Sequence, residues 1–318
     1  MGADTVYAIG LTTRFRGITT REGVLVPGPA GWGEFCPFVE YDDAEAAPWL
    51  AAALEAAHEG WPAPVRDRVP VNCIVPAVDP DRAHAIVVAS GCTTAKVKVA
   101  DASGSLPADL DRVRAVRDAL GAGGAVRVDA NAAWDVGTAV AAIRALDRAA
   151  GGLQYVEQPC ATLEELAAVR RRVDVRVAAD ESIRRAEDPL RVAVAEAADV
   201  AVLKCAPLGG VRRALAVADS CGLPCVVSSA LQTSVGLAAE LALAAALPKL
   251  EFACGLGTAA LLRADVVEPT AALVPREGWL PVSRRAPEPV RRAAVAADSD
   301  RAAWWRDRLA RVSALVVA

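Results

Sequence analysis

Short apolar runs alternate with amphipathic stretches over most of the chain. The apolar runs predict eight strands, near residues 69–75, 94–99, 125–130, 154–157, 175–179, 199–204, 224–228 and 250–254. Apolar residues at three- and four-residue spacing predict intervening helices over 80–90, 108–120, 136–149, 162–172, 187–197, 210–220 and 233–247. This repeat predicts an α/β fold, a (β/α)₈ barrel, with an open doubly wound sheet as the alternative.

The segments on either side of this repeat predict a small second domain. The N-terminal part carries four patterns in order, which are a strand at 7–15, a strand at 23–27, the GWGEFCPF turn and a helix over 43–58. A capped amphipathic helix is predicted to begin at Asp298 or Ser299. We therefore expect an α+β capping domain over 1–66, with 283–318 packing back on it, and a catalytic barrel over 67–282.

Composition narrows the range of partners. The 318 residues are 54% hydrophobic, which allows a large core, and the net charge of −4 comes without a basic stripe, which argues against nucleic acid. The N-terminus lacks the pattern of a signal peptide, and Glu240 interrupts the apolar stretch 235–247, so we expect no membrane span. The expectation is a cytoplasmic protein that acts on small molecules and is compatible with a monomer.

The choice of residues for proton transfer is also narrow. The eight cysteines are scattered without a compact framework, and both histidines lie in helix patterns, so we expect free buried thiols and no zinc site. Lysine accounts for only four of the 35 basic residues, and three of these lysines end strand patterns: Lys96, Lys98 and Lys204. Arginine stays charged near neutral pH, whereas lysine, like histidine, can exchange a proton there. These lysine positions are therefore candidates for catalysis.

Charged residues gather at the carboxyl ends of the predicted strands, where barrel enzymes place their catalytic groups. Strands two to six end, in order, in Lys96 and Lys98, then Arg127, Asp129 and Asn131, then Glu157, then Asp180 and Glu181, then Lys204. In a ring of eight, strands two and six face each other, so Lys98 and Lys204 are predicted to lie opposite one another.

The three acids fall on the strands between these lysines. Converging carboxylates repel unless a cation neutralises them, and hard oxygen ligands favour Mg²⁺ or Mn²⁺, so we predict a metal on Asp129, Glu157 and Asp180. Taken singly, each acid could instead be a helix cap or a surface ion pair. Arg127 either pairs with a ligand acid or reaches a substrate carboxylate.

The motifs at these strand ends resemble those of the enolase superfamily, in its muconate-lactonizing subgroup. They are the Lys-x-Lys at 96–98, the Asp-x-Asn at 129–131, VEQP, ADES and LKCAPLGG. The resemblance implies an α+β cap on a (β/α)₇β barrel, with Mg²⁺ on the three acids. It also implies removal of a proton next to a carboxylate to give an enediolate. Lys98 would be the base, since the cations around it disfavour its charged form.

Further segments are similar to the o-succinylbenzoate synthase family of that subgroup, namely FRGITTREGVL, GWGEFCPFVEY, VPVNCIVPAV, SSALQTSVGL and CGLGTAALL. That similarity implies Mg²⁺-dependent dehydration of 2-succinyl-6-hydroxy-2,4-cyclohexadiene-1-carboxylate in menaquinone biosynthesis. Lys98 would remove the α-proton and then protonate the departing hydroxyl, while Lys204 would stabilise the enediolate from the opposite face. The expected substrate contacts are Lys96, Arg127, Ser228, Ser229 and Gly255, the last three near the succinyl group with backbone amides as donors.

Other activities fit the same strand-end residues. A racemase of N-acylamino acids would use Lys98 and Lys204 as two bases, and a muconate-type cycloisomerase is a further alternative. Dipeptide epimerases carry an Asp-x-Asp near the end of strand eight, which CGLGT lacks. A Schiff-base aldolase would not need three converging acids, and a barrel that only binds ligands would need neither acids nor lysines.

Overall fold

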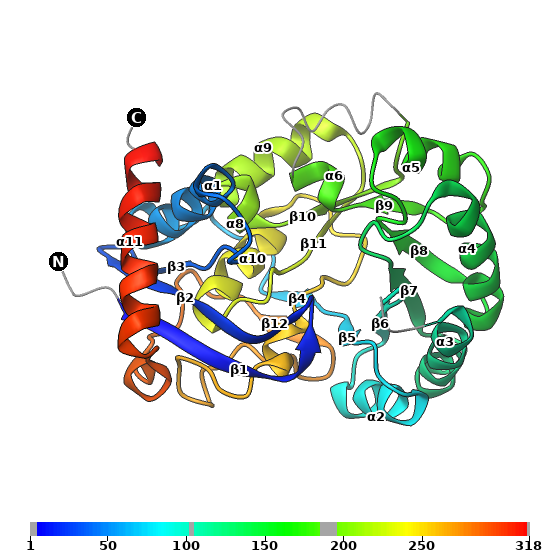
Figure 1. The fold of residues 1–318 in the computed structure, drawn as a ribbon, viewed down its shortest axis with the longest axis horizontal. Coiled ribbons are helices and arrows are strands. Elements are labelled where there is room, and N and C mark those ends of the chain that lie inside the picture. The colour runs from blue at the N-terminus through cyan, green and yellow to red at the C-terminus, as the bar shows by residue number, and fades with distance from the viewer. Residues whose placement is uncertain (1–4, 102–104, 185–195, 317–318) are drawn as a thin grey trace.

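A curled sheet of seven parallel strands forms the larger part of the molecule in the computed structural model, which describes residues 5–101, 105–184 and 196–316 (Figure 1). Its strands lie in chain order: β5 (Cys73–Val75), β6 (Thr94–Lys98), β7 (Ala125–Asp129), β8 (Leu153–Glu157), β9 (Val177–Ala179), β10 (Val200–Leu203) and β11 (Cys225–Val227). A doubly wound sheet would reverse its strand order at a switch point, and this sheet does not.

Two bridges close the ring where the eighth strand is predicted. Cys254 bridges Val71 and Gly255 bridges Ser228, both in parallel. The Gly255 amide donates to the carbonyl of Val227 over 2.8 Å. The predicted TIM-like (β/α)₇β fold is therefore confirmed, with its last strand reduced to two residues, and the open-sheet alternative is wrong.

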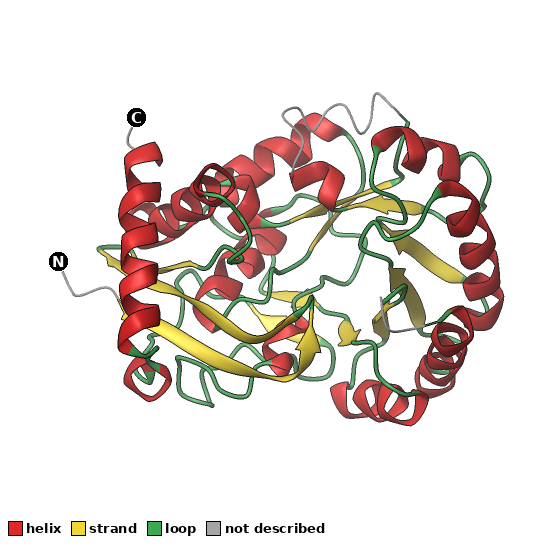
Figure 2. Cartoon of the chain, viewed as in Figure 1, coloured by secondary structure: helices red, strands yellow, loops and turns green. Residues whose placement is uncertain are grey.

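Helices cover the outside of the ring (Figure 2). They are α2 (Pro80–Ser90), α3 (Leu106–Leu120), α4 (Val136–Ala150), α5 (Leu163–Arg170), α6 (Glu181–Arg184), α8 (Cys205–Leu208), α9 (Val211–Cys221) and α10 (Ser234–Ala246). Several begin at a polar cap, such as Asp79 and Asp135, whose side chains accept from the amide three residues on. The helix predicted over 187–197 lies largely outside the described residues.

The smaller domain is an antiparallel sheet covered by two helices. It contains β1 (Thr5–Phe15), β2 (Ile18–Gly28), β3 (Gly31–Phe35), α1 (Asp43–Leu54), a π-helical turn (Glu55–Glu59) and α11 (Ser299–Val316). The GWGEF part of the predicted turn is strand β3, because each of its residues pairs with β2. The predicted strand at 69–75 is divided: β4 (Arg68–Pro70) pairs with β12 (Trp279–Pro281), and only β5 enters the barrel.

The two domains have separate apolar cores. One lies between the barrel strands and their helices. The other lies between the N-terminal sheet, α1 and α11 and extends to barrel residues such as Ile74 and Leu231. Trp305 of α11 is fully buried, and its ring centre lies 6.0 Å from that of Phe35 on β3. The C-terminal helix is therefore packed on the N-terminal sheet.

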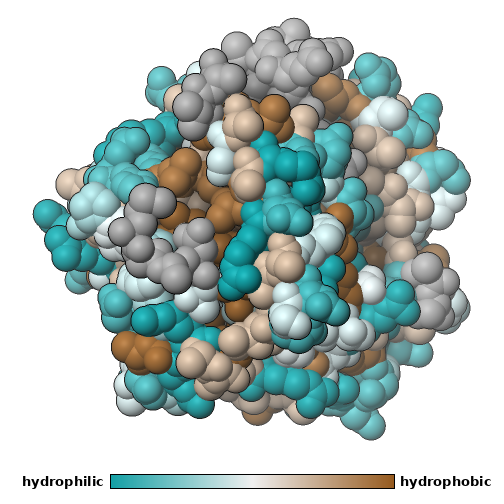
Figure 3. All heavy atoms as spheres, turned by 60° about the vertical axis from the view of Figure 1, so that its left-hand side comes forward, coloured by the Kyte–Doolittle hydropathy of each residue, from teal (hydrophilic) through white to brown (hydrophobic). Residues whose placement is uncertain are grey.

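The polarity of the surface and the state of the cysteines match the expectations drawn from the composition. The face seen in Figure 3 is largely hydrophilic, and hydrophobic side chains show there in small patches and a hollow. Within the described part of the chain, no helix combines the length and the apolar character needed to cross a bilayer. All eight cysteines are free and buried, as predicted.

Candidate active site

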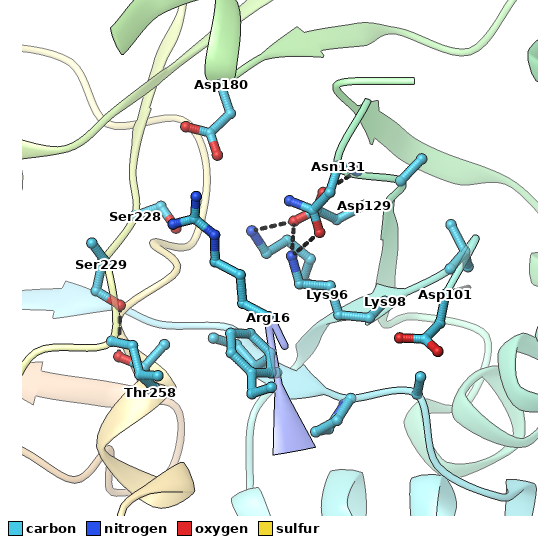
Figure 4. A pocket seen from close by; sticks show the side chains of 18 of the residues that line it. Arg16, Lys96, Lys98, Asp101, Asp129, Asn131, Asp180, Ser228, Ser229 and Thr258 are labelled. Carbon is cyan, nitrogen blue, oxygen red and sulfur yellow. Dashed lines mark hydrogen bonds and ion pairs between the residues drawn. The ribbon is translucent and has the colours of Figure 1, made fainter. Parts of the chain in front are cut away.

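A pocket of about 290 Å³ lies at the carboxyl ends of the barrel strands (Figure 4). Its charged lining from the barrel consists of Lys96, Lys98, Asp101, Asp129, Asp180 and Lys204, and its polar lining includes Asn131, Ser228, Ser229 and Thr258. The end of β1 adds Arg14 and Phe15, and the β1–β2 turn adds Arg16. The pocket thus gathers residues that are up to 244 positions apart in the sequence, from Arg14 to Thr258.

Strand register explains why the charges meet. Lys98 pairs with Asp129 across β6 and β7, and Asp129 pairs with Glu157 across β7 and β8. Glu157 in turn pairs with Ala178, two residues before Asp180. Because alternate residues of a strand share a face, the three acids point to the same side of the sheet at its carboxyl edge.

Lys98 lies beside the first acid. Its Nζ is 2.5 Å from Asp129 Oδ2 and donates to Asn131 Oδ1 over 2.7 Å. The same Nζ lies 5.4 Å from the ring centre of Phe15, which belongs to the cap. Asn131 has a positive φ of 47°, a conformation that asparagine tolerates better than most residues. The turn after β7 therefore places Asn131 Oδ1 as a second oxygen acceptor beside the Lys98 ammonium group.

Lys96 links two of the acids in the buried part of the site. Its Nζ lies 2.8 Å from Glu157 Oε1 and 3.2 Å from Asp129 Oδ2. Burial disfavours its charge, but the two carboxylates outweigh that effect and raise the pKa of Lys96, so it stays an ammonium. Burial and the charge of Asp129 raise the pKa of Glu157 to about 7.

Lys204 lies beside the third acid. Its Nζ is 2.5 Å from Asp180 Oδ2, and both side chains are buried. In the sheet order, β10 with Lys204 is separated from β6 with Lys98 by the three strands that carry the acids. Figure 4 shows Asp180 across the pocket from Lys98 and Asp129. The two lysines therefore belong to opposite ends of the row of acids.

The acids are held by lysines in this arrangement. Among the described residues, no three His, Cys, Asp or Glu side chains come close enough together to hold one metal ion. Asp129, Glu157 and Asp180 each contact a lysine in this arrangement, and their convergence on a metal ion stays a prediction. Their charges still interact, since Asp129 and Asp180 both raise the pKa of Glu157. The ligand atoms that these three acids offer are all carboxylate oxygens, which are the atoms that Mg²⁺ and Mn²⁺ prefer.

Arg127 lies inside the barrel, below the pocket. Its Nε donates to Gln154 Oε1 over 2.6 Å and its Nη1 donates to Asn72 Oδ1 over 3.1 Å. Its guanidinium carbon lies 4.7 Å from the ring centre of Tyr155. Two residues of strand place it about 7 Å deeper than Asp129 on the same face. None of these contacts is with Asp129, Glu157 or Asp180, and a substrate contact of Arg127 stays a prediction.

The serine and glycine positions differ in what they offer a ligand. Ser228 and Ser229 line the pocket, but their amides donate to Leu203 and Gly255 within the barrel. The Gly255 amide likewise donates to the carbonyl of Val227. All three amides thus bond within the barrel, and the expectation that they donate to the substrate is corrected. A Cβ on Gly255 would lie 2.6 Å from Ser228 Oγ, so a side chain there would displace the Ser228 hydroxyl.

The structure adds residues that sequence reasoning missed. Arg16 has a positive φ of 49° in the β1–β2 turn, and Figure 4 shows its side chain extending into the pocket towards Ser228. Its guanidinium carbon lies 3.9 Å from the ring centre of Phe38. Gln158 is fully buried and accepts from the amide of Asp180 over 2.9 Å, which fixes the end of β9. The signal for Gln158 is its place directly after the strand-end acid. For Arg16, the sequence marks only the cap loop near Arg16–Arg21 as a segment that could cover the site, without giving its role.

Comparison with known proteins identifies the family. Residues 80–287 match the enolase C-terminal domain-like family and residues 6–57 match the enolase N-terminal domain-like family. The chain is 64% identical over 96% of its length to an o-succinylbenzoate synthase of Thermobifida fusca, of which 94% is covered. The chain belongs to the o-succinylbenzoate synthase family of the enolase superfamily. A second member of that family, from Mycolicibacterium smegmatis, is 55% identical over 98% of this chain and 95% of its own.

Solved structures of the superfamily share the fold. A dipeptide epimerase of Enterococcus faecalis, complexed with Mg and a dipeptide, superposes with a TM-score of 0.74 at 22% identity. The match covers 90% of this chain and 97% of the epimerase. The cap and the barrel of this family member therefore have the arrangement found in the wider superfamily.

Proposed function

We propose that this chain is an o-succinylbenzoate synthase, a hydro-lyase that converts 2-succinyl-6-hydroxy-2,4-cyclohexadiene-1-carboxylate to o-succinylbenzoate and water in menaquinone biosynthesis. The observation that carries this proposal is the identity of 53 to 64% over nearly the whole chain to proteins of that name. The pocket supports it with acids that lie between two lysines, an arrangement suited to chemistry at a carbon next to a carboxylate.

The proposed metal is Mg²⁺, with Mn²⁺ as the alternative, and its ligands are Asp129, Glu157 and Asp180. All three carboxylates are at least 98% buried, and buried acids of this density need compensating positive charge. When bound, the ion would supply positive charge against the substrate carboxylate and so make the neighbouring proton more acidic. In the structure, the positive charge that neutralises these acids comes from Lys96, Lys98 and Lys204. Binding of the metal ion therefore requires the lysines to give up part of their contact with the acids.

Lys98 is the proposed base and acid. As a neutral amine, it takes the proton from the carbon that bears the carboxylate, and the C–H electron pair passes into that group to form an enediolate. The ammonium so formed then gives the proton to the hydroxyl on the adjacent carbon. The C–O bond breaks with its electron pair on oxygen, water leaves, and the ring becomes aromatic. Lys96 stays an ammonium in contact with Glu157 and Asp129, so it takes no part in this proton transfer.

Lys204 is the proposed counter-charge on the opposite side. Its ammonium is held by Asp180 at 2.5 Å and is 8% exposed to the pocket. From this side it stabilises the negative charge of the enediolate without taking a proton. Arg16 and the Ser228 hydroxyl are the proposed contacts for the carboxylate of the succinyl arm, because both line the pocket and the Arg16 side chain extends towards Ser228 (Figure 4).

The test is to supply the cyclohexadiene carboxylate with Mg²⁺ and to follow the aromatic product by absorbance. Rapid, metal-dependent formation of o-succinylbenzoate is expected. The racemase alternative uses the same Lys98 and Lys204, so N-succinylamino acids are offered in parallel and their optical rotation is followed. Fast racemisation with no dehydration would replace the proposal by the racemase.

A further inference from the structure

The segment that forms one wall of the pocket is held from outside the barrel. Residues 228–236 follow β11, supply Ser228 and Ser229 to the pocket, and then begin α10. Arg21 and Glu34 of the cap, about 200 positions earlier in the chain, bind this segment, and Thr258 and Asp265 also bond to it. Tertiary contacts therefore add to the local turn contacts of Gln232 and Thr233 in positioning the segment.

Arg21 of β2 holds the middle of the segment. It is 2% exposed, and its Nε donates to the carbonyl of Leu231 over 2.9 Å. Its Nη2 donates to the carbonyl of Ala230 over 3.3 Å and also to the carbonyl of Cys36 in the cap. Leu231 has a positive φ of 63°, an unfavourable conformation for a leucine that needs external support. The guanidinium carbon lies 4.5 Å from the ring centre of Phe38, which fills the space beside it.

Glu34 of β3 holds the end of the segment. Its carboxylate accepts from the amide of Gly236 over 2.8 Å and from both the amide and the hydroxyl of Thr233. The Tyr7 hydroxyl donates to Glu34 over 2.6 Å, and burial and the Glu34 charge raise the pKa of Tyr7, so that it keeps this proton. A Cβ on Gly236 would lie 2.8 Å from Glu34 Oε2, so only glycine allows this approach. The cap thus supplies the carboxylate at the N-terminus of α10.

The barrel connects the same segment to Lys204. The Gln232 side chain accepts from the amide of Ala230 over 2.7 Å and donates to Glu240 over 2.9 Å. Glu240 also accepts from the amide of Cys205, the residue after Lys204, over 2.7 Å. A shift of the segment would therefore change its position relative to the lysine.

We infer that Arg21 and Glu34 are positioning residues, through which the cap sets the place of Ser228 and Ser229 in the substrate pocket. This inference rests on the proposed function, because it takes these serines to contact the non-reacting arm of the substrate. Interactions with a non-reacting arm are made equally in the ground state and the transition state, so their loss raises KM more than it lowers kcat.

The experiment compares Arg21→Met with Glu22→Gln. Glu22 is the next residue on the same strand, but it binds Arg301 and Trp305 of α11 and not the pocket segment. Hydrogen exchange of the intact protein is expected to show amides of 230–236 exchanging at least about tenfold faster in Arg21→Met, with α11 unchanged. In Glu22→Gln the faster exchange is expected in α11, with 230–236 unchanged.

Kinetics with the cyclohexadiene carboxylate give the second readout. Arg21→Met is expected to raise KM about tenfold with kcat within about threefold of wild type, and Glu22→Gln to leave both unchanged. Arg21→Lys keeps the charge but cannot reach three carbonyls, so it should lie between wild type and Arg21→Met in both readouts. Where Arg21→Met does not fold, Arg21→Lys and Glu34→Gln decide the question.

Two outcomes would overturn the inference. One is wild-type exchange in 230–236 together with an unchanged KM. The other is faster exchange spread evenly over the barrel strands, which would show a purely structural role. Failure of the proposed function is distinguishable, because wild-type protein would then show no dehydration while the exchange comparison still reports whether Arg21 positions the segment.

Discussion

The barrel interior contains two layers of charge that differ in what surrounds them. In the lower layer, Arg127 is enclosed by Asn72, Gln154 and two aromatic rings, and every partner is another part of the barrel. In the upper layer, two residues further along the same strands, Asp129 and its neighbours meet lysines at the wall of a pocket. A charge at a strand end is therefore a site residue or a core residue according to a depth of about 7 Å.

The strongest test of the upper layer is Lys98→Arg. Arginine keeps the charge near Asp129 but does not act as a base near neutral pH, so kcat is expected to fall about 10³-fold with little change in the melting temperature. Steady-state dehydration kinetics measure this effect. Lys249→Arg changes an exposed lysine and is expected to leave kcat unaltered. Substantial activity in Lys98→Arg would remove Lys98 from the proposed chemistry.

The matching test of the lower layer is Arg127→Met. It leaves Asn72, Gln154 and the Ala253 carbonyl without their donor, so the free energy of unfolding is expected to fall by about 3–4 kcal/mol. Urea unfolding measures the change, and Arg114→Met, at an exposed ion pair, should cost less than about 0.5 kcal/mol. A large fall in kcat of the folded variant, with little loss of stability, would place Arg127 in the upper layer after all.

Glu240 of α10 is a further fully buried acid, outside both layers. Burial raises the pKa of Glu240 to about 7 from an ordinary 4.5. The folded protein then holds a proton that the unfolded chain releases, so stability falls as pH rises from 4.5 to 7, by about 3 kcal/mol from this group. Glu240→Gln should remove that dependence, measured as the wild-type minus variant difference in unfolding free energy. An equal pH slope in both proteins, with exposed Glu251→Gln as control, would contradict the assignment.

The smallest expected effect is the stabilisation of the protein by Mg²⁺, which should depend on the upper layer and not on the lower one. Mg²⁺ at a hundred times its Kd is expected to stabilise wild type by about 2.7 kcal/mol, followed by thermal unfolding with and without chelator. Asp129→Asn should lose this response, while Arg127→Met and the exposed Asp118→Asn should keep it. Retention of the full response in Asp129→Asn would show that the ion binds elsewhere.

Much of the fold and the order of the site followed from local patterns. Apolar periodicity is a property of neighbouring residues, so the strands, most of the helices and the ring of parallel strand ends were predictable from it. The lysines at 96, 98 and 204 and the acids at 129, 157 and 180 lie on strands adjacent in sequence and in space, and their order around the pocket could be counted. The departures are at irregular places, such as strand β3 within GWGEF and the two-residue eighth strand.

The sequence by itself determined which charged residues stand at the rim of the barrel and in what order, because strand register and alternation are local rules. Only the tertiary structure decided the depth of Arg127, the use of the Ser228, Ser229 and Gly255 amides within the barrel, and the contacts of Arg21 and Glu34 with residues 230–236. These features depend on groups as much as 210 residues apart, whose pairing is set by the packing of the cap on the barrel and leaves no periodic trace in the chain.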